Sequence, residues 1–226
     1  MKKLFYAMFI AVSLIPLCSM AQGVKYDVHA GANLSGYVSG NHYTAQDRDM
    51  KVGAGLGVGI SYETDNRFVI SSGLDFLLVR GGFTAMSEYV SPTGGPFTTF
   101  PSVNTREISI QVPLKFGYDF HLGEKWHFVP AIGVYGRFSM ISIKDNVTEN
   151  TGEGTTTFKW NCFNTYQGSS RLSSYNRWDI GGLIEGKFTY LDRYSVSLGY
   201  NRGFLDKSSQ FKFKNQGCHF TIGYTL

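Results

Sequence analysis

The sequence of 226 residues has little of what marks a zinc module, a nucleic-acid-binding protein or a helical membrane protein. Its three cysteines and five histidines match no zinc or redox spacing. Beyond the N-terminal segment no run of 18 apolar residues occurs, which excludes a membrane-spanning helix there. Charged residues make up only 17% and the net charge is +4, so neither nucleic acid nor a polybasic membrane anchor is indicated.

The N-terminal segment has the organisation of a secretory signal peptide. A short basic region precedes an apolar stretch over 4–17, which is shorter than the roughly 20 residues of a spanning helix. Ser19 and Ala21 then place small residues where a signal peptidase reads them. We expect 1–21 to be removed and 22–226 to form one domain.

Alternation of apolar with small or polar residues dominates the rest of the chain. Over 50–62, valine, alanine, leucine and isoleucine alternate with glycine and serine, and 107–120 alternates in a similar way. A period of two predicts β-strands with one apolar and one polar face. The 27 glycines, 6 prolines and 15% aromatic residues agree with a β-rich chain.

Eight such segments follow one another, separated alternately by tight turns and long polar loops. The tight turns are 63–66, 121–125 and 192–193. This short–long alternation predicts an all-β fold, an eight-stranded antiparallel up-and-down transmembrane β-barrel with both termini at the short-turn rim. Bulges are expected where Pro113 and Pro130 interrupt strands. The expected strands are 26–36, 50–62, 67–80, 106–120, 126–139, 176–191, 194–204 and 216–226.

The polar face decides between a soluble barrel, apolar inside, and a membrane barrel, apolar outside. It carries mostly glycine, serine, asparagine and threonine, whereas a soluble exterior would show many more charges. Small polar residues suit a narrow lumen. We therefore predict an integral outer-membrane barrel that contacts outer-membrane lipids and is inserted by the barrel-assembly machinery.

Aromatic residues gather at both ends of the apolar faces, as in the interface girdles of membrane barrels. The alternative is that these rings pack a soluble core. Those near the long loops are Tyr37, Phe138, Trp178 and Phe204. The girdle near the short turns comprises Tyr62, Phe68, Phe120, Trp126, Phe188, Tyr190, Tyr194 and Tyr224.

Charged residues of both signs are predicted to face the lumen. An isolated buried charge is costly, so in a narrow barrel these charges have to pair. We expect a salt-bridged plug and little or no conductance, with Lys115 at the depth of Glu185 and close to Asp75. A proton or ion path is the alternative. The predicted network is Asp75, Lys115, Arg137, Asp179, Glu185 and Lys187.

His29 and His219 lie on the first and eighth strands, which become neighbours when the barrel closes. Because no carboxylate motif adjoins them in the sequence, we expect a hydrogen-bonded lumen pair, with catalysis as the lesser alternative. No enzyme, metal site or cofactor is expected. Cys162 lies in a long loop and Cys218 faces outward near the rim, and the sequence leaves open whether they form a disulfide.

The loop 140–175 carries aromatic residues among serine, threonine, asparagine and glycine, a composition common in recognition surfaces. The alternative is that these rings fold over the barrel mouth as a small cluster. The candidate binding residues are Phe158, Trp160, Phe163, Tyr166, Arg171 and Tyr175.

Three stretches resemble the PorT-like outer-membrane β-barrel proteins of Gram-negative bacteria. Residues 25–35 (KYDVHAGANLS) are similar to the opening strand of that family, 73–82 (GLDFLLVRGG) to its third strand, and 108–116 (ISIQVPLKF) to its central strand. The resemblance implies an integral outer-membrane barrel, and the founding member is linked to protein secretion and gliding. The chain departs from the common barrel pattern in ending on Leu226 rather than on an aromatic residue.

Together these patterns predict a non-enzymatic outer-membrane barrel with a plugged lumen, whose long extracellular loops bind a surface or envelope partner. The family resemblance implies an alternative, an accessory component of a protein-secretion machine. The remaining alternatives are a small porin-like channel and, least favoured, a membrane lipid hydrolase.

Overall fold

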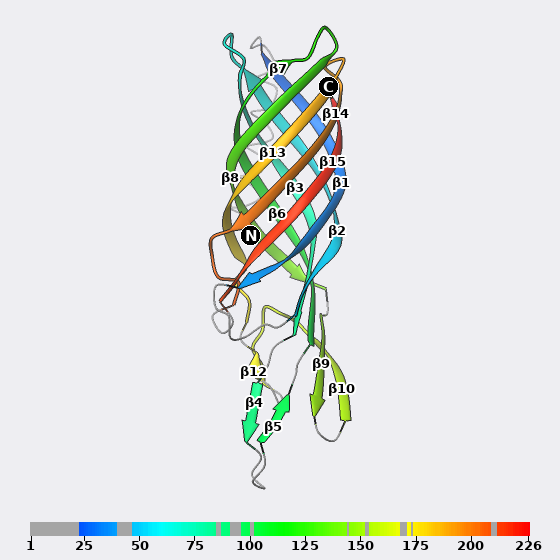
Figure 1. Ribbon diagram of the computed structural model, residues 1–226, viewed down its shortest axis with the longest axis vertical. Coiled ribbons are helices and arrows are strands. Elements are labelled where there is room, and N and C mark those ends of the chain that lie inside the picture. The colour runs from blue at the N-terminus through cyan, green and yellow to red at the C-terminus, as the bar shows by residue number, and fades with distance from the viewer. Residues whose placement is uncertain are drawn as a thin grey trace, which may run out of the picture.

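Eight long antiparallel strands close into a β-barrel in which each barrel strand pairs with the next along the chain (Figure 1). β1 pairs with β15 and completes the ring, so the topology is the expected up-and-down one. The barrel strands are β1 (Val24–Ser39), β2 (Asp47–Glu63), β3 (Phe68–Thr84), β6 (Ser102–Tyr118), β8 (Trp126–Ser142), β13 (Trp178–Tyr190), β14 (Tyr194–Gly203) and β15 (Phe213–Thr225).

The computed structural model describes residues 23–39, 47–84, 87–90, 96–99, 102–143, 145–151, 154–167, 171–172, 174–208 and 212–226. The expected signal peptide lies outside these residues. Among them, no helix is long and apolar enough to cross a membrane. The shorter strands are β4 (Ser87–Val90), β5 (Pro96–Thr99), β7 (Phe120–His121), β9 (Asp145–Thr151), β10 (Gly154–Trp160), β11 (Tyr166–Gln167) and β12 (Arg171–Leu172).

The two rims of the barrel differ in length. Tight turns form one rim, at the top of Figure 1, together with the C-terminus. At the other end the hairpins β4–β5 and β9–β10 project well beyond the barrel wall. Several strands continue into segments that the sequence analysis assigned to loops: β2, β3, β6 and β8 each have 17 residues, more than the 9–11 or so that cross a bilayer.

The outer surface of the barrel is apolar over its whole circumference. Even-numbered side chains point outward along most of each barrel strand, and Val52, Ile132 and Leu198 are more than 60% exposed. The exception is the end of β8, where Ile141 is 54% exposed beyond a register shift. Odd-numbered positions point inward and include buried charged groups such as Arg137 and Asp179. Because water would not tolerate so continuous an apolar surface on a monomer, lipid is its solvent.

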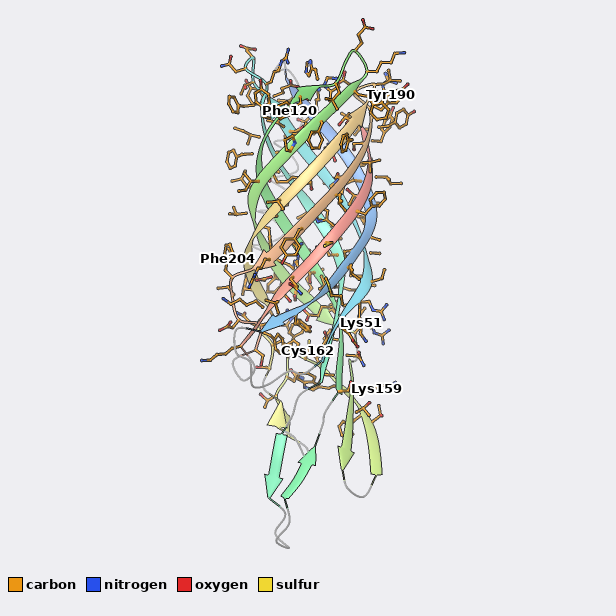
Figure 2. The ribbon with its side chains drawn as sticks, in the orientation of Figure 1. Lys51, Phe120, Lys159, Cys162, Tyr190 and Phe204 are labelled. Carbon is orange, nitrogen blue, oxygen red and sulfur yellow. The ribbon has the colours of Figure 1, made fainter. Side chains whose placement is uncertain are left out.

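Aromatic rings form a belt at the short-turn rim, where Figure 2 shows Phe120 and Tyr190. Among the described residues, seven of the eight predicted girdle residues, all except Tyr62, pack against one another or against further rings. Trp126 packs on Tyr190 with ring centres 4.6 Å apart, and Tyr194 lies 5.5 Å from Tyr224. Phe68 and Phe120 both contact Tyr118, and Phe188 stacks on Phe128.

The bulges expected at the two prolines are absent. Register is continuous past Pro130, and past Pro113 two pairs are missing from the β3–β6 ladder without any change of register. Ser72 Oγ donates to the Pro113 carbonyl (2.7 Å) and so keeps this segment attached to β3. The register shifts lie elsewhere. One is between Met50 and Ala54 in β2, and the other is in β8, where Met140 is the extra residue opposite Ile108 and Ser109 of β6.

At the β2 irregularity, side chains from β1 reach across β2 to the backbone of β3. Asn33 Nδ2 donates to the Ala54 carbonyl (3.1 Å) and to the Leu78 carbonyl (3.2 Å). Ser35 Oγ donates to the Arg80 carbonyl at 2.6 Å. This crossing requires glycine at position 53, because a Cβ there would lie 1.9 Å from the Leu78 oxygen.

Gly53→Ala is therefore expected to destabilise the barrel by about 1–3 kcal/mol, since backbone has to move to admit the methyl group. Gly136→Ala is the control: a Cβ at position 136 has no neighbour within 4 Å, so stability should change by less than about 0.5 kcal/mol. Urea titration of the barrels folded in detergent micelles measures both, and equal losses would contradict the close approach at Gly53.

Candidate functional site

Charged side chains of both signs line the barrel interior and contact one another across strands. One series of contacts starts at Lys187, whose Nζ lies 3.6 Å from Asp27 Oδ1. Asp27 Oδ2 is 3.0 Å from His29 Nδ1, and His29 Nε2 is 2.9 Å from Asp75 Oδ1. Gln111 Nε2 donates to Asp75 Oδ2 at 3.4 Å. These contacts link β13, β1, β3 and β6.

Arg137 is held at the far end of this series by neutral groups. Its Nε and Nη2 donate to Gln111 Oε1 at 3.0 and 2.7 Å, and its guanidinium lies 5.0 Å from the Tyr135 ring centre. Asp179 stands opposite Arg137 in the register but accepts hydrogen bonds from Tyr135 (3.1 Å) and Asn215 (2.8 Å). In the described residues these two charges form no ion pair, which corrects the expectation of a plug made wholly of salt bridges.

A second group of contacts centres on Glu185. Its Oε1 accepts from Lys115 Nζ at 2.7 Å, and its Oε2 lies 3.1 Å from His219 Nε2. The juxtaposition of Lys115 and Glu185 that register predicts is present in the structure, and Lys115 contacts Glu185 rather than Asp75. Strands β6, β13 and β15 are thereby joined through one carboxylate.

The prediction that His29 and His219 pair with each other is wrong. Gly223 stands opposite His29 and Asn33 opposite His219, so the two rings lie at different levels of the β1–β15 ladder. Each imidazole contacts carboxylates instead. Closing a barrel requires a stagger in register between the first and last strands, and this stagger separates the two histidines along the strands. That β1 and β15 are neighbours is therefore not enough to predict that these rings meet.

A cavity of about 160 Å³ occupies the part of the lumen that the contacts leave open. Its walls run from Lys25 and Asp192 at the short-turn rim to Arg137 and Asn201 further along the barrel. The charged groups described above, apart from Asp179, border it. A space of this size beside charged groups has room for several water molecules, at about 30 Å³ each.

The end of the barrel towards the long loops is covered by a packed cluster, here called the cap. Rings from the barrel and from the loops meet edge to face: Tyr175 lies 6.2 Å from Tyr37, 5.5 Å from Phe213 and 5.4 Å from Trp160. The cap consists of Tyr37, Val103, Trp160, Cys162, Tyr175 and Phe213, with Phe158 and Phe163 packed against it.

An ion pair is buried directly beneath the cap. Lys207 Nζ lies 2.6 Å from Glu107 Oε2, and both side chains are only 3% exposed. The ammonium also donates to Ser139 Oγ at 3.3 Å, and Cys162 Sγ lies 3.9 Å from Glu107 Oε1. The sequence analysis missed this pair because Lys207 sits in a loop, where its polar pattern reads as solvent-exposed.

The loop residues proposed as a recognition surface are divided by the structure. Trp160 and Tyr175 are buried and Phe158 and Phe163 are partly buried, so these four rings adopt the alternative arrangement, a cluster over the mouth. Tyr166 and Arg171 lie in the β11–β12 hairpin, and their side chains fall outside the described residues.

The two cysteines are not bridged. Cys162 is fully buried in the cap, whereas Cys218 is exposed on the lipid-facing side of β15, and no disulfide joins them. Figure 2 shows Cys162 at the mouth opposite the short-turn rim. The open alternative of a disulfide is thus decided against.

Ion pairs also tie the strands together at the short-turn rim. Lys25 Nζ lies 3.1 Å from Asp192 Oδ1 and 3.5 Å from Glu63 Oε2. Partial burial by itself would raise the pKa of the Asp192 carboxyl, but the hydrogen bond and charge of Lys25, with smaller contributions from two nearby histidines, hold that pKa below its ordinary value.

In the described part of the chain, three side chains that could bind a metal ion lie close together at this same rim. Asp119, His121 and His127 each offer a ligand atom, and these atoms lie within 4.8 Å of one another. The sequence analysis missed the group, although Asp119 and His121 share the inward parity and a tight turn places His127 opposite His121.

The closed barrel, apolar outside and polar within, is the construction of an integral outer-membrane β-barrel protein, and the chain is a member of that class. Neither the protein-family models nor the curated proteins contain a match to the sequence. Among solved structures it is similar to Neisserial surface protein A (12% identity, TM-score 0.42, covering 91% of this chain and 100% of that one). Ail of Yersinia pestis is also similar (9% identity, TM-score 0.37, covering 91% of this chain and 100% of that one). So is OprG of Pseudomonas aeruginosa (10% identity, TM-score 0.40, covering 90% of this chain and 96% of that one).

Removing one partner of the buried ion pair should destabilise the capped barrel strongly. Lys207→Met leaves the Glu107 carboxylate buried without its cation, and we expect a loss of about 3–5 kcal/mol. Glu107→Gln combined with Lys207→Met removes both charges and should recover most of that loss. Urea unfolding followed by tryptophan fluorescence measures the cycle. A double variant less stable than Lys207→Met would contradict it.

Proposed function

We propose that the chain is a non-enzymatic, non-conducting outer-membrane barrel that presents its long-loop end to a surface or envelope partner. The observation that carries this proposal is the extension of β3, β6, β9 and β10 beyond the apolar wall, above a packed cap. Loops held on such a rigid support are suited to recognition. In this proposal lipids surround the wall and the barrel-assembly machinery inserts it.

The contacts of the lumen histidines support the non-enzymatic part of the proposal. Within the described residues, His29 contacts Asp27 and Asp75, and His219 contacts Glu185. No hydroxyl or thiol of those residues is hydrogen-bonded to either imidazole, whereas a hydrolase needs a nucleophile beside its base. A lipid hydrolase is therefore the least favoured alternative.

For the finer assignment we propose the PorT-like family, with an accessory role in protein secretion as the second candidate function. The observation that favours it is the structural role of residues 25–35, the stretch that resembles the opening strand of that family. Asn33 and Ser35 of that motif hydrogen-bond across β2 to β3, so the motif residues build the barrel wall. A structural role of this kind supports likeness of architecture, and the secretion role rests on the resemblance alone.

The non-conducting part is tested in planar lipid bilayers. We expect no stable single-channel steps from the wild-type chain, because the cap packs over one end of the barrel and the large side chains of Tyr135 and Arg137 are buried in the lumen. A porin of known conductance, reconstituted in the same bilayers, controls for detection of conductance. Stable steps from the wild-type chain would support the small-channel alternative and contradict the proposal.

The binding part is tested by trimming the β9–β10 hairpin without disturbing the cap. Val147 and Phe158 face each other in the hairpin, so residues 148–157 can be replaced by an Asn-Gly turn that keeps Phe158 against the cap. Cross-linking in outer-membrane preparations should lose the partner found with the wild-type chain. Glu124→Gln, at the opposite rim, should retain it. Identical cross-links from wild-type and trimmed chains would contradict binding through this hairpin.

A further inference from the structure

Three potential metal ligands meet on the inner lip of the short-turn rim. Asp119 follows the last residue of β6, His121 lies in β7, and His127 is the second residue of β8. Asp119 Oδ2 is 3.0 Å from His127 Nδ1 and 3.4 Å from His121 Nε2. The two imidazole rings stand edge to face with their centres 4.4 Å apart, as a directly opposed pair across the β7–β8 hairpin.

The second carboxylate oxygen of Asp119 points to a missing ligand. The side chain is 5% exposed, and its Oδ1 is buried without a hydrogen-bond partner among the described residues. A buried carboxylate oxygen left in this state is costly, and native proteins supply a donor, a water molecule or a cation. A cation held by Asp119 Oδ2 and the two imidazole nitrogens would neutralise this buried carboxylate, whose Oδ1 has no donor among the described residues.

A second carboxylate stands behind one of the rings. His127 Nε2 lies 3.8 Å from Asp192 Oδ1, and Asp192 is itself held by Lys25. When one nitrogen of a histidine binds a metal, the other commonly donates to a carboxylate that fixes the ring and raises its basicity. In His127, Nδ1 faces Asp119 and is placed to bind the metal, whereas Nε2 faces Asp192 on the other side of the ring.

We propose that Asp119, His121 and His127 bind a divalent transition metal of the zinc class, with Asp192 as a positioning residue for His127. Two imidazole nitrogens and one carboxylate oxygen suit Zn²⁺, whereas Ca²⁺ and Mg²⁺ prefer oxygen ligands alone. Tetrahedral bonds of about 2.1 Å bring ligand atoms to about 3.4 Å from one another. The three ligand atoms lie within 4.8 Å of one another, so some are further apart than this. The His121 side chain is 38% exposed, and its ring can turn to bring its nitrogen closer to the other two ligand atoms. Three protein ligands leave a fourth position open to water or an exogenous ligand.

The test is isothermal titration of ZnCl₂ into the mature chain, folded in detergent micelles and carrying no histidine tag. We expect one saturable site per chain. Asp119→Asn and His127→Gln should each weaken binding by about 100-fold or more, and Asp192→Asn by about 10-fold. Glu124→Gln, an exposed charge on the same rim, and His219→Gln, a lumen histidine, should leave the affinity unchanged. Co²⁺ should give the absorption bands of a tetrahedral site.

Two outcomes would overturn the proposal: no saturable binding at ZnCl₂ concentrations up to about 100 μM, or one site that persists unchanged in the Asp119 and His127 variants. Folding of each variant is checked by its heat-sensitive mobility on gels. If Asp119→Asn fails to fold, His121→Gln decides the question, because that ring is partly exposed and its loss leaves the Asp119–His127 contact in place.

Discussion

The structure depends on one constraint: charged side chains in the part of the wall that faces lipid are excluded from the lipid side and have to be accommodated inside. Outward positions there are even-numbered, so the charged residues at odd positions converge on a narrow lumen. There each charge needs a partner. The series from Lys187 to Arg137 and the group around Glu185 are the result, and they tie neighbouring and non-neighbouring strands together.

The same constraint explains why small residues matter on the inner face. Side chains that reach across the lumen or over a strand need space above the backbone that they cross. Asn33 passes over Gly53 to reach the Leu78 carbonyl, and the ring of His219 lies within 2.5 Å of the point where a Cβ of Gly199 would stand. Glycine on the inward face is therefore part of the hydrogen-bonding scheme, and its abundance is more than a consequence of tight turns.

Local pattern was sufficient to predict the barrel, its eight strands, its topology and the side of the sheet that faces lipid, because a period of two is a local property. The contact between Lys115 and Glu185 also followed from the register of β6, β8 and β13. The prediction for His29 and His219 failed because it depended on the stagger around the closed barrel. The state of Cys162, which the sequence left open, and the Glu107–Lys207 pair, which it did not reveal, both depend on loop folding. Asp119, His121 and His127 could have been found, since parity and one tight turn bring them together.

The two ends of the lumen have opposite chemistry, and this separates the roles that they can take. Towards the long loops, rings and a buried ion pair cover the barrel, and none of the cap residues borders the cavity. Towards the short turns, the cavity wall includes Lys25, Asp119, His127 and Asp192, of which Lys25 and Asp192 are well exposed. In the described residues, the lumen charges are therefore accessible from the short-turn side, where the imidazoles stand. Under the proposed function a macromolecular partner would meet the loops at the other end, so its binding need not alter the chemistry at the short-turn rim.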